Sequence, residues 1–171
     1  MVRIGFLSAV AITVVMHVAS VCAKDNSRTI GTWIVSHTID NMDDSVKDVI
    51  ISPDVDEKYA LVLRCFSKEP EAYVFVGEGG DKFEDKDGYK AMFRSDQTKP
   101  LDMAGTAQSN GSIKLSQPVD VIRGALGGNK LAFRFDGLNE SFSSDVVFQT
   151  ARNKEALGDI VKDCAIPPSG G

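Results

Sequence analysis

The chain has little histidine and little cysteine, with 2 His and 3 Cys among 171 residues. This scarcity limits metal chemistry, because zinc in proteins is held mainly by imidazole nitrogen and thiolate sulfur. It also limits nucleophilic catalysis, because a Ser-His-Asp or Cys-His mechanism needs a histidine base. No G-x-S-x-G motif, the mark of one large class of serine hydrolases, occurs in the sequence. We therefore expect no metal, no cofactor and no catalytic residues of these kinds.

Basic residues are also in the minority. The chain has 19 Lys and Arg against 24 Asp and Glu, which gives a formal net charge of −5 at pH 7. General nucleic-acid binding depends mostly on the neutralisation of phosphates by Lys and Arg. A chain with this charge is not expected to bind nucleic acid.

A long apolar run occurs only near the N-terminus. It covers residues 4–18, follows the single charge of Arg3, and is followed by small residues up to Ala23. This pattern predicts a signal peptide over residues 1–23, cleaved after Ala23. A membrane helix is the alternative, but the run is short for a span of about 20 apolar residues. Anchoring as a lipoprotein at Cys22 is a lesser alternative.

Cleavage would leave one domain over residues 24–171, exported and with no membrane span. It would remove Cys22 and leave two cysteines, Cys65 and Cys164, with His37 as the remaining histidine. A cysteine pair in an exported chain indicates a disulfide, because disulfides persist in oxidising compartments.

Short β-rich runs separated by turn residues predict a mainly β fold, an antiparallel β-sandwich with a short helix and a C-terminal helix. The segment 98–115 is ambiguous and could hold one or two weak strands. Residues 24–30 and 167–171 have the composition of frayed ends. The predicted strands are 32–38, 46–52, 59–66, 72–77, 89–95, 130–135 and 142–149.

Two segments show helical spacing instead. Residues 116–127 begin with a potential capping Ser116 and end at Gly127, which predicts a short helix. Residues 151–164 carry an apolar stripe at helical spacing that ends at Cys164, which predicts the C-terminal helix.

Strand alternation connects the two cysteines. Alternate residues of a strand share a face, so Cys65 points the same way as Leu61 and Leu63, toward a core. Cys164 lies on the apolar stripe of the last helix. A Cys65–Cys164 disulfide would hold that helix over the sheet and close a loop of about 100 residues, worth roughly 4–5 kcal/mol in the chain-entropy model. Two free buried cysteines are the alternative.

His37 and the acidic clusters are the remaining candidates for chemistry. His37 falls near the end of a predicted strand, close to Asp40, where a rim histidine is the simpler interpretation. The clusters at 40–44 and 81–87 could suggest calcium, but the second departs from the EF-hand order, since Phe83 occupies a ligand position. Both are typical of polar turns. Because the chain has 24 acidic residues, catalysis of glycoside hydrolysis by a pair of carboxylates is a further alternative, although the sequence does not single out one pair.

Three arginines form a candidate binding patch. Arg64, Arg94 and Arg134 lie on separate predicted strands, each on the side facing away from the core. If the strands are neighbours, the three guanidinium groups could hold a carboxylate or a phosphate. Ordinary solvated arginines paired with acids are the alternative. The sequences NGS at 110–112 and NES at 139–141 match the glycosylation acceptor pattern, which has meaning only in a eukaryotic secretory pathway.

Several motifs occur together in one order. Trp33 in the first strand is followed by DDS at 43–45, LVLRC at 61–65, an aromatic strand YVFVG and FRSD at 93–96, and the last helix ends at Cys164. In this order the chain resembles the TagO (VasI) family associated with bacterial type VI secretion, over residues 33–164. Where that family has Trp-x-x-Ser, this chain reads LDMAGTA.

The resemblance implies a periplasmic accessory protein of the Gram-negative cell envelope rather than an enzyme. Its partner would be a protein of the envelope, such as a secretion-system component, or cell-wall glycan. The motif order and the lack of a catalytic set favour this non-catalytic binding function. One alternative is a secreted inhibitor that binds a foreign enzyme through the loop 77–88, and another is a carboxylate-dependent glycan hydrolase.

Overall fold

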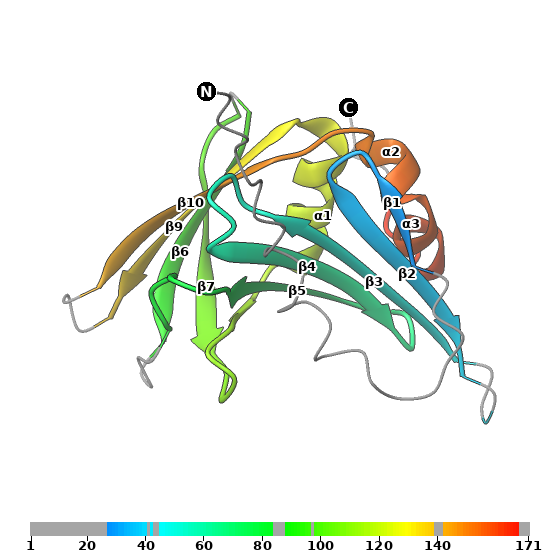
Figure 1. Cartoon of the computed structure of the whole chain (residues 1–171), viewed down its shortest axis with the longest axis horizontal. Coiled ribbons are helices and arrows are strands. Elements are labelled where there is room, and N and C mark those ends of the chain that lie inside the picture. The colour runs from blue at the N-terminus through cyan, green and yellow to red at the C-terminus, as the bar shows by residue number, and fades with distance from the viewer. Residues whose placement is uncertain are drawn as a thin grey trace, which may run out of the picture.

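The computed structural model describes residues 27–40, 42, 45–83, 88–96, 98–138 and 142–167. These residues form ten strands and three short helices (Figure 1). In chain order the elements are β1 (Arg28–Ile30), β2 (Trp33–Ile39), β3 (Val46–Pro53), β4 (Tyr59–Phe66), β5 (Glu69–Val76), β6 (Tyr89–Ser95), β7 (Leu101–Ala107), β8 (Ile113–Leu115), α1 (Pro118–Gly127), β9 (Lys130–Gly137), β10 (Ser143–Gln149), α2 (Asn153–Ala156) and α3 (Gly158–Asp163).

All ten strands belong to one sheet, in the order β1-β2-β3-β4-β5-β8-β7-β6-β9-β10. Every pair of neighbours in this order is antiparallel. The first five strands follow one another in sequence, and the order then reverses so that β8 pairs with β5. The predicted mainly β, antiparallel fold with helices is confirmed.

The sheet bends strongly enough for strands that are distant in its order to touch. β4 and β10 lie six places apart in the order. Even so, the hydroxyl groups of Tyr59 and Ser144 are hydrogen-bonded at 3.2 Å, and the amide of Val55 donates to the carbonyl of Val147. The two halves of the sheet, β1–β5 and β6–β10, therefore enclose one shared core, and the layers of the expected sandwich are parts of a single continuous sheet (Figure 1).

Phe83 occupies a central place in that core. It comes from the segment between β5 and β6, is 1% exposed, and its ring contacts those of Tyr59, Tyr89, Phe135 and Phe142. These four rings belong to both halves of the sheet, so Phe83 joins the halves. Phe83, which occupies a ligand position of the EF-hand pattern in the sequence, is thus an apolar core residue of the segment between β5 and β6.

The strand faces agree with the predicted alternation. In β4, Tyr59, Leu61, Leu63 and Cys65 are buried while the residues between them are more exposed. β6 and β9 show the same period of two. Because side chains alternate across a strand, this pattern fixes which face of each strand meets the core.

The structure refines the predicted element boundaries at several places. β1 lies within the segment 24–30 that was predicted to be frayed, because Ile30 is buried and pairs with Trp33 across a tight turn. Gly31 in that turn has a φ of +62°, and a Cβ there would collide with the carbonyl oxygen of Ala151. The ambiguous segment 98–115 holds two strands, β7 and β8. The predicted C-terminal helix is divided into α2 and α3 at Leu157.

Buried polar contacts fasten the helices to the sheet. The indole Nε1 of Trp33 donates a 2.8 Å hydrogen bond to Oδ1 of Asn153, the first residue of α2. The Nδ2 group of Asn153 donates in turn to the carbonyl of Gly128, directly after α1, and to Oγ1 of Thr150. These bonds hold α1 and α2 against β2 and β10 at one end of the molecule (Figure 1).

A disulfide joins Cys65 in β4 to Cys164 directly after α3. The two residues are 99 apart in sequence, and their Cα atoms are 5.7 Å apart. The bond secures the end of the chain across the face of the β3–β4 hairpin. The pairing predicted from the two independently inward-facing cysteines is the one that the structure contains.

Removing this bond is expected to destabilise the protein. The double variant Cys65→Ser/Cys164→Ser should lose about 2–5 kcal/mol of unfolding free energy, because the unfolded chain regains the freedom of a long loop. Urea denaturation followed by circular dichroism measures the difference. Wild type treated with a thiol reductant should match the double variant, and an unchanged midpoint in both samples would contradict a stabilising bond.

Candidate functional site

A histidine, an aspartate and a cysteine lie in one row across three strands. In the sheet register, His37 of β2 is opposite Asp48 of β3, and Asp48 is opposite Cys65 of β4. Directly paired residues share a face of the sheet, and this row is on the face that meets the core. Cys65 is bonded to Cys164, the residue after Asp163. The disulfide therefore brings the end of α3, with Asp163, to the row.

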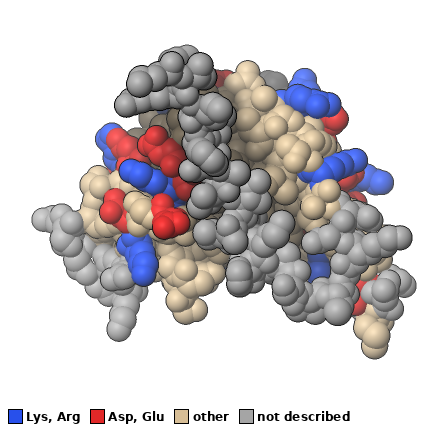
Figure 2. Space-filling view, viewed as in Figure 1, with Lys and Arg blue, Asp and Glu red and all other residues tan. Residues whose placement is uncertain are grey.

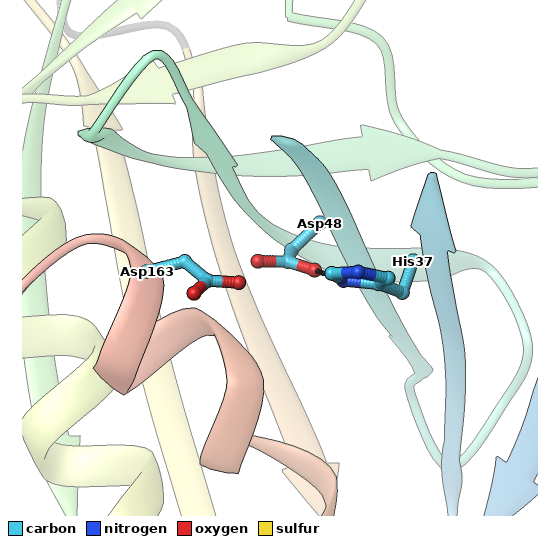
Figure 3. Close-up of side chains that lie close together, drawn as sticks. All are labelled: His37, Asp48 and Asp163. Carbon is cyan, nitrogen blue, oxygen red and sulfur yellow. Dashed lines mark hydrogen bonds and ion pairs between the residues drawn. The ribbon is translucent and has the colours of Figure 1, made fainter. Parts of the chain in front are cut away.

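The three titratable side chains converge. Nδ1 of His37 lies 2.6 Å from Oδ1 of Asp48. One donor atom from each of His37, Asp48 and Asp163 can be chosen so that all three lie within 4.8 Å of one another. Figure 3 shows Asp48 between the other two, with the imidazole on one side and the Asp163 carboxylate reaching from its helix on the other. We call these residues the His-Asp-Asp cluster.

Burial is unequal within the cluster. The Asp48 side chain is 2% exposed, whereas that of His37 is 40% exposed. Oδ2 of Asp48 is buried and makes no hydrogen bond within the part of the chain that the structure describes. Buried polar atoms in proteins nearly always have a partner, because leaving one unpaired costs about 1–3 kcal/mol. In the described part of the chain, Oδ2 of Asp48 is thus a buried carboxylate oxygen without a hydrogen-bond donor.

The surroundings of Asp48 oppose its negative charge. Burial raises the pKa of the Asp48 carboxyl above its ordinary value; the hydrogen bond with His37 acts in the opposite direction, and the carboxyl of Asp163 raises the pKa further. Two neighbouring carboxylates cannot both ionise freely without a positive charge between or beside them. The cluster therefore favours either a proton or a cation at this place.

Neither catalytic hypothesis from the sequence gains support from the cluster. A carboxylate pair for glycoside hydrolysis must flank a sugar bond in an accessible cleft. The Asp48 side chain is 2% exposed, so it does not line a cleft of this kind. The hydrogen bond of His37 in the described part of the chain joins Nδ1 to Asp48, and no bond from the imidazole to a hydroxyl group occurs there.

The three predicted arginines are not brought together. Arg94 and Arg134 are on neighbouring strands, since Met92 pairs with Arg134 and Arg94 with Ala132. Arg64 is on β4, four places from β6 in the sheet order. β6 and β9 are thus neighbours, as the candidate patch requires, but β4 is not next to either of them. Arg64, Arg94 and Arg134 therefore do not form one patch.

Two of the three arginines also have acidic partners, as the alternative interpretation predicted. Arg134 makes two hydrogen bonds to the carboxylate of Asp145, at 2.7 and 2.9 Å. Arg64 contacts Glu71 at 2.5 Å and the Tyr73 hydroxyl at 2.8 Å. On the described part of the face seen in Figure 2, basic and acidic side chains lie beside each other rather than in one large basic area.

Glu71 organises the outer face of β4, β5 and β8. It accepts hydrogen bonds from Arg64, from Tyr73 and, at 2.6 Å, from Lys114. Burial opposes the ionisation of Glu71, but the hydrogen bonds from Lys114, Arg64 and Tyr73 together lower the pKa of this carboxyl to about 2. Beside this network is an open hollow of about 440 Å³, whose lining includes Lys47, Val49, Arg64, Phe66 and Glu71.

Exposed apolar side chains occur at the end of the sheet nearest the cluster, with Ile39 on the His37 face of β2 and Phe66 on the Arg64 face of β4. Ile39 at the end of β2 is 54% exposed, Met42 in the following turn 93%, and Phe66 at the end of β4 48%. Phe66 is opposite Lys47 in the register, next to the row that contains Asp48 and Cys65. We call Ile39, Met42 and Phe66 the apolar tip.

Several sequence predictions fall outside the described residues. The signal peptide 1–23 is among them, as are Asn41, Asp43 and Asp44 of the first acidic cluster, Glu84, Asp85 and Asp87 of the second, and the sequence NES at 139–141.

The described parts of these motifs have local structural roles. Asp40 accepts hydrogen bonds from Lys47 and from the amide of Met42, as in a polar turn. In the first glycosylation motif, Asn110 accepts hydrogen bonds from the backbone and the side chain of Ser112.

Sequence reasoning missed Asp48 and Asp163, although signals for both were present. In VKDVIIS, alternation places Asp48 on the same face as Ile50, so a charged residue occupied a core position. Asp163 directly precedes a cysteine whose bond to Cys65 had been inferred. The expectation of no zinc rests on the numbers of histidines and cysteines, and a mixed site of one imidazole and two carboxylates lies outside that argument.

Comparisons with protein-family models, with curated proteins and with solved structures find no match. Among the described residues, no helix has the length and apolar character needed to cross a membrane.

The Glu71 network predicts a pH-dependent contribution to stability. The folded-state pKa of Glu71 is lowered to about 2 from 4.5, so its stabilisation is present above pH 4.5 and is lost as the pH falls toward 2. Glu71→Gln should cost about 1–2 kcal/mol at pH 7, a value reduced because Arg64 and Lys114 are partly exposed to solvent. Urea unfolding at pH 7 and at a series of lower pH values measures this cost.

The control for this prediction is Glu69→Gln, which changes an exposed acid on the same strand and should alter stability by less than about 0.5 kcal/mol. An equal effect of both variants, or a Glu71→Gln effect that does not shrink on acidification, would show that the network does not provide the stabilisation.

Proposed function

We propose that this protein is a non-catalytic binding protein exported to an oxidising compartment, where it binds a protein of the cell envelope. The Cys65–Cys164 disulfide supports export, because such bonds form and persist outside the reducing cytosol. The resemblance to the TagO family supports a periplasmic location in a Gram-negative bacterium and a partner among type VI secretion components.

The observation that carries the proposal is the apolar tip. Three large apolar side chains are exposed at one end of the sheet, and Phe66 leaves about half of its surface in water. Covering such side chains with a partner is favourable by about 25 cal/mol per Å² of apolar area. Aromatic residues, Met and Arg are enriched at protein interfaces, and Phe66 and Arg64 both line the hollow beside Glu71.

The position of the tip favours binding in a second way. Phe66 directly follows Cys65, whose disulfide holds β4 to the C-terminal end of the chain. A surface that is already rigid loses less conformational entropy when a partner docks, so more of the contact energy contributes to affinity. The same tip would serve equally well for the alternative function, a secreted inhibitor of a foreign enzyme. Within the loop 77–88, Phe83 is 1% exposed and so is not available for that contact.

Substitution at the tip should weaken partner binding. The tagged protein is produced in its own cells and cross-linked, and the proteins that co-purify from the envelope are quantified by mass spectrometry. Phe66→Ala should lower the recovery of the partner about tenfold or more, because a central aromatic contact is worth roughly 2 kcal/mol. Circular dichroism checks that the variant is folded.

Leu138→Ala is the matched control. Leu138 has the same 48% exposure as Phe66 but follows β9, at the opposite end of the molecule (Figure 1). Recovery with this variant should equal that of wild type. If both variants recover the partner equally well, the tip is not the binding surface. Glycan turnover that one carboxylate substitution abolishes would overturn the non-catalytic assignment.

A further inference from the structure

We propose that the His-Asp-Asp cluster is a binding site for a divalent first-row transition-metal ion of the zinc type. The site would use one imidazole nitrogen of His37 and one carboxylate oxygen each from Asp48 and Asp163. This inference is independent of the apolar tip and of the identity of any partner.

The donor set fits this class of ion. Imidazole nitrogen suits zinc and its neighbours, whereas magnesium and calcium are held by oxygen ligands alone in most proteins. Zinc sites with three protein ligands keep a fourth position for water or another ligand. With zinc–ligand bonds of about 2.0–2.2 Å, the ligand atoms of a tetrahedral site lie about 3.3 Å apart. The cluster already holds its three donor atoms within 4.8 Å, so small side-chain rotations suffice.

The unpartnered oxygen of Asp48 points to a ligand rather than to a chance group of acids. The Asp48 side chain is 98% buried and its Oδ2 has no hydrogen-bond donor among the described residues. Figure 3 shows this carboxylate facing Asp163, another acid, on the side away from His37. A cation between the two carboxylates would satisfy Oδ2 and remove the repulsion together, as a buried charge requires.

The cluster is also accessible to an ion. His37 is 40% exposed and Asp163 is half-buried, so one side of the cluster is open to solvent while Asp48 closes the other. Water molecules could complete the coordination from the open side. The three ligands come from β2, β3 and the end of α3, which the disulfide already holds together at Cys65 and Cys164. The ligands are therefore positioned by the fold before any ion binds.

The test uses the full chain without a histidine tag, after treatment with a chelator. Zinc chloride is titrated at pH 7 by isothermal calorimetry, and elemental analysis gives the bound metal per chain. We expect one zinc ion per chain and weak or no binding of magnesium. Asp163→Asn should weaken zinc binding by at least about tenfold, since loss of even outer-shell partners costs 10–100-fold in affinity.

Asp159→Asn is the matched control. Asp159 is on the same helix and pairs with Arg28 rather than with the cluster, so this variant should bind zinc as wild type does. Nitrogen-15 NMR of the imidazoles supplies a direct readout, because the chain has only His17 and His37. The His37 signals, assigned with His37→Gln, should shift on addition of one equivalent of zinc. Binding should also weaken as the pH falls, because protons compete for the ligands.

Three outcomes would overturn the proposal. The first is no saturable zinc binding by wild type, which would show that the cluster does not hold such an ion. The second is equal binding by Asp163→Asn and Asp159→Asn, which would indicate adventitious surface sites. The third is binding without a shift of the His37 signals. Circular dichroism and non-reducing mass spectrometry confirm that each variant is folded and keeps its disulfide.

Discussion

The Cys65–Cys164 disulfide is the constraint on which the rest of the structure depends. It joins the fourth strand to the end of the last helix, across 99 residues of sequence. Because it lies in the row of His37 and Asp48, it places Asp163 opposite the buried carboxyl. Because Phe66 follows Cys65, it also fixes the end of the sheet at which apolar side chains are exposed. One covalent bond therefore organises both the candidate metal site and the proposed binding surface.

Asp48 is unusual because it places a carboxyl at a core position. A hydrophobic residue of similar size would pack there without any desolvation cost, and buried charges that lack compensation are strongly destabilising. The imidazole of His37 lies within hydrogen-bond distance of Asp48 and partly compensates for the burial of its charge. The second acid, Asp163, increases the free-energy cost of ionising Asp48. Proteins depart from ordinary core composition mainly where a site requires it. The cluster has this character, whereas the other buried polar residues of the described chain are uncharged: Ser52, Ser95, Ser112, Thr150 and Asn153.

The outer face of the sheet shows the opposite use of charge. Arg64 and Lys114 are directed to Glu71, and Arg134 to Asp145, so these cations are paired within the protein. Such pairs position side chains and hold neighbouring strands in register, but they leave little net charge to attract a ligand. The apolar tip and the open side of the cluster, at the same end of the sheet, are therefore the features most suited to contact with other molecules.

The sequence by itself determined the class of fold, the faces of most strands and the cysteine pairing, because alternation and helical spacing depend on local geometry. It also identified His37, Arg64, Arg94 and Arg134 as residues of interest. It did not determine which strands are neighbours, and this decided that Arg64 lies apart from the other two arginines and that His37 lies opposite Asp48. The disulfide then brought Asp163 to these two residues. Pairings between residues distant in sequence depend on how the sheet bends and on the reversal of strand order after β5. These are properties of the whole folded chain, and no local pattern encodes them.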